Sequence, residues 1–173
     1  YNLTVSKEKI KVTGVTAGAW TASGTTTGDL VVAGIPYVTF KAEQPQTFKM
    51  TAKGGYEITG LQYSVNYGEW KTVAANEEVT FGGTNGTLRL RGTNTNGTAS
   101  AWSGYSTITF TDKNVKVACT GDIRTLLDWR NYNIVDTQNA RFCSLFKDCS
   151  VLTSAPELPA TKLVDDCYNR MFE

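Results

Sequence analysis

The sequence predicts a mainly β protein whose central part is an antiparallel β-sandwich. Short segments of alternating apolar and polar residues, separated by Gly, Thr and Asn, fill the chain before residue 120. After residue 120 the apolar residues recur at spacings of three and four, and short motifs begin to repeat. We therefore divide the chain into an N-terminal arm or linker (1–35), a β-sandwich module (36–119) and a segment of different architecture (120–173).

The arm has two expected strands and a long connection. Leu3 with Val5, and Ile10 with Val12, show the alternation of short strands. Thr16 to Gly28 is nearly all Thr, Ala, Gly and Ser. A loop of this length is unusual inside a compact domain, so we interpret it as a linker, or as an arm ordered against a protein partner.

The central module is predicted from its alternation. In Leu61 to Val65 the odd positions are apolar or aromatic, Asn66 to Glu69 supply turn residues, and Trp70 to Val73 would return as the partner strand. The same pattern predicts strands at Tyr37–Ala42, Thr47–Thr51, Glu78–Phe81, Thr87–Arg91, Ser106–Phe110 and Val115–Cys119, with loops at 82–86 and 92–100. So many short strands with frequent turns favour an Ig-like sandwich. The residues expected inside it are Tyr63, Val65, Leu88, Leu90, Ile108 and Phe110.

The last segment shows helical spacing in three places. The apolar residues concerned are Ile123, Leu126 and Leu127, then Phe142, Leu145 and Phe146, then Val164, Cys167, Tyr168 and Met171. Short helices are expected there. Between the second and third sets, Leu152 to Pro159 contains two prolines, which predict an extended or turning path.

A repeat is visible in the same segment. Leu145-Phe146-Lys147 recurs as Met171-Phe172-Glu173 at an offset of 172 − 146 = 26, which falls within the range of leucine-rich repeats. The stretch from Cys149 to Thr161, followed by Asp166-Cys167-Tyr168 and Met171-Phe172, resembles the repeat of BspA-like leucine-rich repeat surface proteins.

The resemblance implies the start of an α/β solenoid. Its repeat core would contain Cys149, Leu152, Leu158, Cys167, Tyr168, Met171 and Phe172. Arg141 stands where the same offset from Cys167 would place a cysteine, so residues 121–148 are expected to be an atypical first repeat or cap. The next repeat cysteine would fall at 149 + 26 = 175, and the array is therefore expected to be truncated within a unit.

Composition argues against catalysis and against several partners. With 17 basic and 16 acidic residues, the chain has no global field for nucleic acid. It has no histidine, and its four cysteines do not form a CxxC pair, so neither a metal site nor a histidine-based catalytic centre is expected. Loop 82–86 lacks the Gly-Lys-Ser/Thr of a phosphate loop, and we expect no cofactor. The longest apolar run, 30–36, is too short to cross a membrane.

Six residues are candidate ligand contacts. Trp102 and Tyr105 follow a polar loop, and exposed aromatic rings can stack on sugars. Tyr67 and Trp70 lie at a hairpin, although a Trp at a hairpin base more often belongs to the core. Arg89 and Arg91 share one strand face, which is either a plain exposed face or a grip for an anion or an acidic glycan.

The resemblance implies a non-catalytic, extracellular binding or adhesion protein of the bacterial cell surface, presenting its repeats to host or bacterial macromolecules, either a protein or a glycan. Two alternatives stay open. One is a phage virion protein, whose arm docks on the particle while the repeats project as a fibre. The other is a carbohydrate-binding accessory of a surface glycan-uptake system.

Overall fold

The computed structural model describes residues 2–5, 10–13, 34–84 and 86–173. The chain divides into two units, Tyr1–Val32 and Ala33–Glu173. In the first, β1 (Asn2–Val5) and β2 (Ile10–Thr13) pair antiparallel, which confirms the two strands expected there. The connection expected at 16–28 lies outside the described residues.

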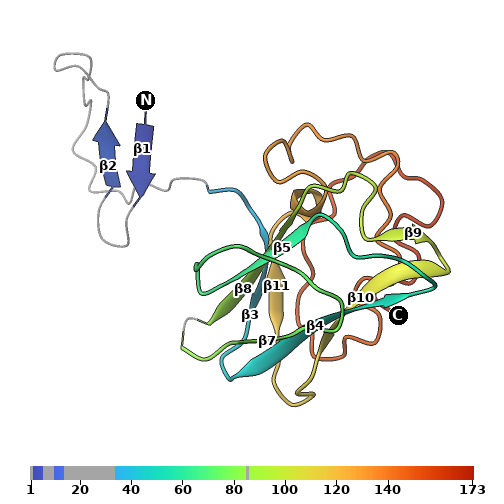
Figure 1. Ribbon diagram of the computed structural model, residues 1–173, viewed down its shortest axis with the longest axis horizontal. Helices are drawn as coiled ribbons and strands as arrows, with labels where there is room; N and C mark the ends of the chain where they lie inside the picture. The colour runs from blue at the N-terminus through green and yellow to red at the C-terminus, as the bar shows by residue number, and fades with distance from the viewer. Residues whose placement is uncertain (1, 6–9, 14–33, 85) are drawn as a thin grey trace. The chain divides into compact units, whose positions relative to one another are not determined.

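The second unit contains two antiparallel sheets (Figure 1), an arrangement consistent with the expected sandwich. One sheet has the order β7-β4-β10-β9, and the other has the order β11-β3-β8-β5-β6. Their strands are β3 (Val38–Lys41), β4 (Gln46–Lys53), β5 (Leu61–Val65), β6 (Lys71–Thr72), β7 (Glu78–Phe81), β8 (Thr87–Gly92), β9 (Ala99–Ala101), β10 (Gly104–Phe110) and β11 (Ala118–Thr120).

The expected strands of the central module are all present, with two corrections. Strand β9 lies partly within the expected loop 92–100, because its small residues give no alternation to detect. It pairs with β10 through Ala99 and Ala101. Strand β11 begins at Ala118 instead of residue 115, and Val117 bonds to the C-terminal segment.

Aromatic rings fill the space between the two sheets. Phe40 on β3 meets Phe110 on β10 edge to face, with ring centres 5.3 Å apart, and Phe48 on β4 packs beside both. Of the six residues expected inside, Tyr63, Leu88, Leu90, Ile108 and Phe110 are buried. Val65 is half-buried because it ends β5 next to the exposed turn at Asn66.

The C-terminal segment contains one short 3-10 helix among the described residues, η1 (Ile123–Leu126). The helices expected around 142–146 and 164–171 are wrong, because the chain there forms separate four-residue turns. Leu145 N donates to Phe142 O, and Met171 N donates to Tyr168 O. Each region contains a residue with a left-handed backbone, Ser144 (φ 55°) or Arg170 (φ 52°), which stops a helix from propagating.

These turns are joined to the edges of both sheets. Ile108 N on β10 donates to Leu145 O (2.8 Å), and Val117 N, just before β11, donates to Val151 O (3.0 Å). Parallel bridges pair Val117 with Leu152 and residue 122 with residue 157. Phe142, Leu145, Phe146 and Val151 are buried in the same apolar cluster as the sandwich residues. Residues 36–119 and 120–173 therefore share one core.

Asp122 fixes the junction between β11 and η1. Its buried carboxylate accepts a hydrogen bond from Arg124 N (2.8 Å) and forms a salt bridge with the Arg124 guanidinium (2.7 Å). We expect Asp122→Ala to lower the free energy of unfolding by about 2–3 kcal/mol, because a cap and a partly buried ion pair are lost together. Asp122→Asn keeps a side-chain oxygen for the cap but loses the ion pair, so its free energy of unfolding should fall by about half as much. Urea unfolding of both variants tests this, and equal losses would contradict the role of the cap.

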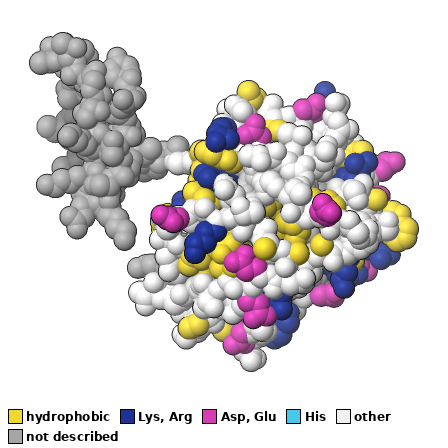
Figure 2. Space-filling model, in the orientation of Figure 1, with side chains coloured by type: hydrophobic (Ala, Val, Ile, Leu, Met, Phe, Trp, Pro, Cys, Tyr) yellow, Lys and Arg dark blue, Asp and Glu magenta, His cyan; other side chains and the backbone are white. Residues whose placement is uncertain are grey.

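No helix in the described part of the chain is long and apolar enough to cross a membrane. Basic and acidic side chains are interspersed on the visible face of the described residues (Figure 2), in keeping with the net charge of +1.

Candidate functional site

The recurrence seen in the sequence corresponds to stacked aromatic rings. Phe142 stacks on Tyr168 and Phe146 stacks on Phe172, with an interplanar angle of 11° in both pairs. The ring centres are 6.0 and 5.4 Å apart. Both pairs have the offset of the sequence repeat, since 168 − 142 = 26 and 172 − 146 = 26. Residues 142–149 and 166–173 thus form two superimposed layers, which we call the stacked turns.

Backbone hydrogen bonds hold the two layers together. Phe142 N donates to Cys167 O (2.6 Å), and Ser144 N donates to Asn169 O (2.9 Å). Further along, residue 146 bonds to residue 171 and residue 148 to residue 173 in the same way. Donor and acceptor numbers rise together, so the two layers run parallel. The left-handed residues Ser144 and Arg170 have the same offset again, since 170 − 144 = 26, whereas the left-handed Asp148 and Asp166 are not related by it.

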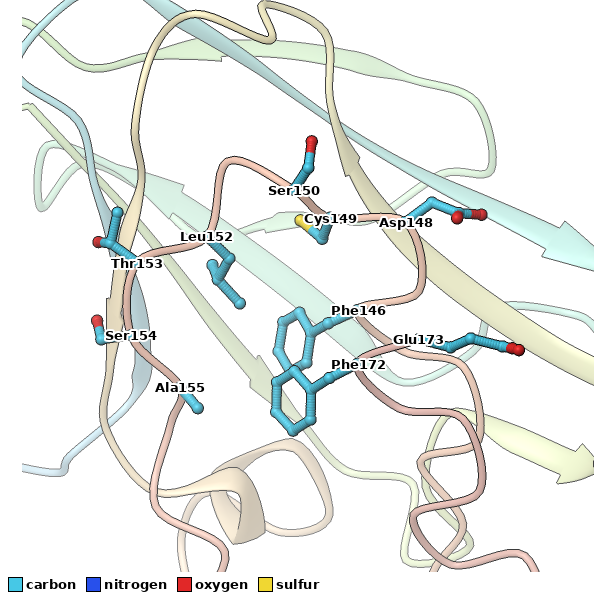
Figure 3. Close-up of a pocket in the computed structure, with 10 residues that line it drawn as sticks. All are labelled: Phe146, Asp148, Cys149, Ser150, Leu152, Thr153, Ser154, Ala155, Phe172 and Glu173. Carbon is cyan, nitrogen blue, oxygen red and sulfur yellow. The ribbon is translucent and has the colours of Figure 1, made fainter.

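A groove of about 510 Å³ lies beside the stacked turns (Figure 3). The rings of Phe146 and Phe172 lie one over the other at its wall, and Leu152 points toward them. Asp148 and Glu173 point away from the groove. The wall is apolar, whereas Thr153 and Ser154 line its rim.

The expected repeat core is buried only in part. Cys167 and Met171 are buried, Cys149, Leu152 and Tyr168 are half-buried, and Leu158 and Phe172 are 36% and 48% exposed. The exposed members leave an apolar surface beside the stacked turns.

Cys149 is half-buried and lines this groove. Burial raises the pKa of its thiol to about 11, so below about pH 9 its thiolate fraction should be about a hundredfold lower than that of an exposed thiol of pKa 9.0. We expect iodoacetamide to label Cys149 slowly at pH 8 and about tenfold faster at pH 9, with the buried Cys119, Cys143 and Cys167 reacting later. Mass spectrometry of timed samples tests this order, and a pH-independent rate would refute it.

A second cluster lies on the outer face of the five-stranded sheet. Leu88 and Leu90 of β8 face the core, so Arg89 and Arg91 face outward. The Arg89 guanidinium lies 4.4 Å from the ring centre of Tyr67 and 5.0 Å from that of Trp70. We call the whole set the guanidinium–aromatic row: Tyr37, Tyr67, Trp70, Arg89, Arg91, Trp129 and Arg130.

Two side-chain hydrogen bonds orient the row. Arg89 Nη2 donates to Ser64 Oγ (3.2 Å), and Arg91 Nε donates to Gln62 Oε1 (2.8 Å). The Nε atom of Arg89 is buried and has no hydrogen-bond partner among the described residues. Burial, with a further contribution from the charge of Arg91, lowers the pKa of Arg89. Within the described chain, neither arginine has a carboxylate within 4 Å.

The structure brings together four of the six candidate ligand residues, namely Tyr67, Trp70, Arg89 and Arg91. Trp70 contacts Tyr37 and both arginines on the outer face, so its interpretation as a core residue is wrong. Trp102 lies in the turn between β9 and β10 and is 64% exposed, and Tyr105 is half-buried on β10. No aromatic or cation contact between described residues connects this pair to the row.

Sequence reasoning missed three members of the row, Tyr37, Trp129 and Arg130. Trp129 contacts Arg91 from far along the chain, since 129 − 91 = 38. The alternation of Arg89 and Arg91 and the hairpin position of Tyr67 and Trp70 were local signals of the row, but nothing in the sequence indicated that the two pairs meet or that Tyr37, Trp129 and Arg130 join them.

Among the described residues, no three His, Cys, Asp or Glu side chains converge as metal ligands would. Comparisons with protein-family models, curated proteins and solved structures give no significant match to this chain.

Proposed function

We propose that this chain is a non-catalytic binding module of a cell-surface adhesion protein. In this proposal an Ig-like sandwich caps the start of a BspA-like leucine-rich repeat array, and the surface of the stacked turns binds extracellular macromolecules. The observation that carries it is the constant spacing of the two layers: both stacked ring pairs are 26 residues apart, and the parallel backbone bonds join residues 25 apart, since 167 − 142 = 25. Parallel layers with a fixed repeat are the geometry of a solenoid.

The edges of the sandwich support the capping role. A solenoid needs its first layer covered, because that layer otherwise exposes apolar side chains and free backbone groups. Here β10 and the residue before β11 supply those backbone partners through Ile108 and Val117. Phe146 packs edge to face on Phe40 of the sandwich, with ring centres 6.3 Å apart, while its other partner is Phe172 of the next layer.

The chemistry of the side chains supports binding over turnover. The chain has no histidine, the commonest general base near neutral pH. Burial raises the pKa of all four cysteine thiols, which weakens them as nucleophiles. An exposed apolar surface beside a polar rim is instead typical of an interaction site.

Binding to immobilised mucin, measured by biolayer interferometry, tests the proposal. We expect the chain to bind and Phe172→Asp to weaken binding by about tenfold, because Phe172 is exposed on the stacked turns and lines the groove beside them. Ile134→Asp is the matched control, since Ile134 is 78% exposed but lies outside the stacked turns, and it should change binding by less than about twofold.

Two further variants separate the repeat surface from the β9–β10 turn. If Trp102→Ala or Tyr105→Ala abolishes mucin binding while Phe172→Asp leaves it unchanged, the site belongs to that turn and binding by the stacked turns is refuted. Absence of mucin binding by the unaltered chain would refute the proposal as a whole. Release of reducing sugar from mucin would refute its non-catalytic part.

A further inference from the structure

A polar groove lies at one end of the guanidinium–aromatic row. Its volume is about 310 Å³, and the side chains that line it include Gln62, Thr72, Arg91, Thr93, Trp129 and Arg130. They come from β5, β6, β8 and the segment after η1, so the fold assembles the groove from four places in the chain.

Two guanidinium groups meet at one aromatic ring in this groove. The central carbons of Arg91 and Arg130 lie 4.3 and 4.4 Å from the ring centre of Trp129. Stacking on an indole orients a guanidinium while leaving its N–H edges free to donate. Arg91 uses only Nε, on Gln62, and the Arg130 side chain makes no hydrogen bond to a described residue. Both therefore keep donors for a ligand.

No carboxylate of the described residues lies within 4 Å of Arg91 or Arg130, so neither forms a salt bridge there. The charge of Arg130 acts on Asp128 only as a minor contribution to the lowered pKa of that carboxyl, which is due first to the hydrogen bond from Asn131. The carboxylate of Asp128, two residues before Arg130, accepts instead from Arg130 N (3.0 Å) and Asn131 Nδ2 (2.8 Å). Two guanidinium groups that line the same groove with free donors favour a carboxylate, which can accept two N–H bonds at once.

The remaining lining indicates the rest of the ligand. Thr72, Thr93 and Gln62 offer hydroxyl and amide groups instead of an apolar wall, which suits a ligand with several hydroxyls. A volume of about 310 Å³ lies at the lower end of ligand sites and suits one or two sugar rings. We propose that this groove binds a carboxylated sugar, with Arg91 and Arg130 donating to its carboxylate. The inference rests on the row alone and is independent of the repeat array.

Isothermal titration of the full chain with trigalacturonic acid tests this site. We expect binding that weakens as salt rises, and no measurable binding of the neutral galactotriose. Arg130→Gln should weaken binding by about tenfold, through loss of a charge-assisted pair. Arg130 is exposed, so this variant should keep its melting temperature. The control is Arg170→Gln, because Arg170 already faces the carboxylate of Glu173 (3.7 Å) and lies on the stacked turns.

A second variant separates ligand binding from support of the fold. Arg91→Lys keeps the charge over Trp70 and Trp129 but loses the planar fork, so binding should weaken while the melting temperature changes little. Equal affinity of Arg130→Gln and the unaltered chain would overturn the proposal. So would equal affinity for galactotriose, or tighter binding of triglutamate or inorganic phosphate than of trigalacturonate. Mucin binding is not an outcome here, so each proposal can fail without the other.

Discussion

Replacing Phe146 by Ala should destabilise the whole of residues 33–173. Its ring is buried and lies between Phe40 of the sandwich and Phe172 of the outer layer. Removing a buried Phe leaves a cavity and costs about 3–5 kcal/mol. Because one core spans both segments, we expect urea unfolding to remain a single transition, with its midpoint shifted to lower urea.

Phe172→Ala is the matched control, since it removes the same ring from the partner that is 48% exposed. It should cost about 1 kcal/mol, in proportion to the smaller area lost from contact. Tryptophan fluorescence, from residues 20, 70, 102 and 129, and far-ultraviolet circular dichroism are two independent probes of the unfolding transition. Two separate transitions would contradict a shared core, and equal losses in the two variants would contradict the position of Phe146 as the link between segments.

The strands of the central module were predictable because alternation is a local property. Leu88 and Leu90 on one side and Arg89 and Arg91 on the other already determine which face of β8 is buried. Strand β9 was not predicted because its Ala and Ser residues show no clear alternation of apolar and polar side chains. Its pairing depends on the turn that returns the chain to β10, and that turn is recognised only in three dimensions.

The repeat was predictable in register but not in local conformation. The offset of 26 residues follows from aligning the recurring motifs of the sequence, and the stacked rings of Phe146 and Phe172 have the same offset. The spacing of Phe142, Leu145 and Phe146 suggested a helix because successive four-residue turns bring the same positions to one side. The left-handed backbone at Ser144 distinguishes successive turns from a continuous helix. A serine does not predict that conformation, because non-glycine residues rarely adopt it.

The guanidinium–aromatic row could be predicted only at its centre. Arg89 and Arg91 were placed on one face from alternation, whereas Tyr37 lies just before β3 and Trp129 lies in the C-terminal segment after η1. Contacts of this kind depend on the order of strands in the sheet, in which β8 lies between β3 and β5. The order of the strands depends on how the whole module packs, so it cannot be predicted from a short segment of sequence.

Gly121 is a position where adding a single methyl group should strongly destabilise the fold. It follows β11 with φ +95°, and its carbonyl accepts from Glu157 N (2.7 Å). A Cβ atom here would overlap Tyr37 O, and the obstacle is backbone that leads into β3. Gly121→Ala should therefore separate β3, β11 and the C-terminal segment where they meet, and we expect a loss of more than about 4 kcal/mol.

Gly55→Ala isolates the contribution of backbone conformation alone. Gly55 also has a positive φ, +75°, but no atom lies within 4 Å of its added Cβ, so the expected cost is about 1–2 kcal/mol. The difference between the two variants measures the clash with Tyr37 O. Urea midpoints give both values, and hydrogen exchange should show lost protection at Asp122 N and Glu157 N in Gly121→Ala only. Equal costs for the two substitutions would mean that the chain relaxes around the methyl group and that this junction is not rigid.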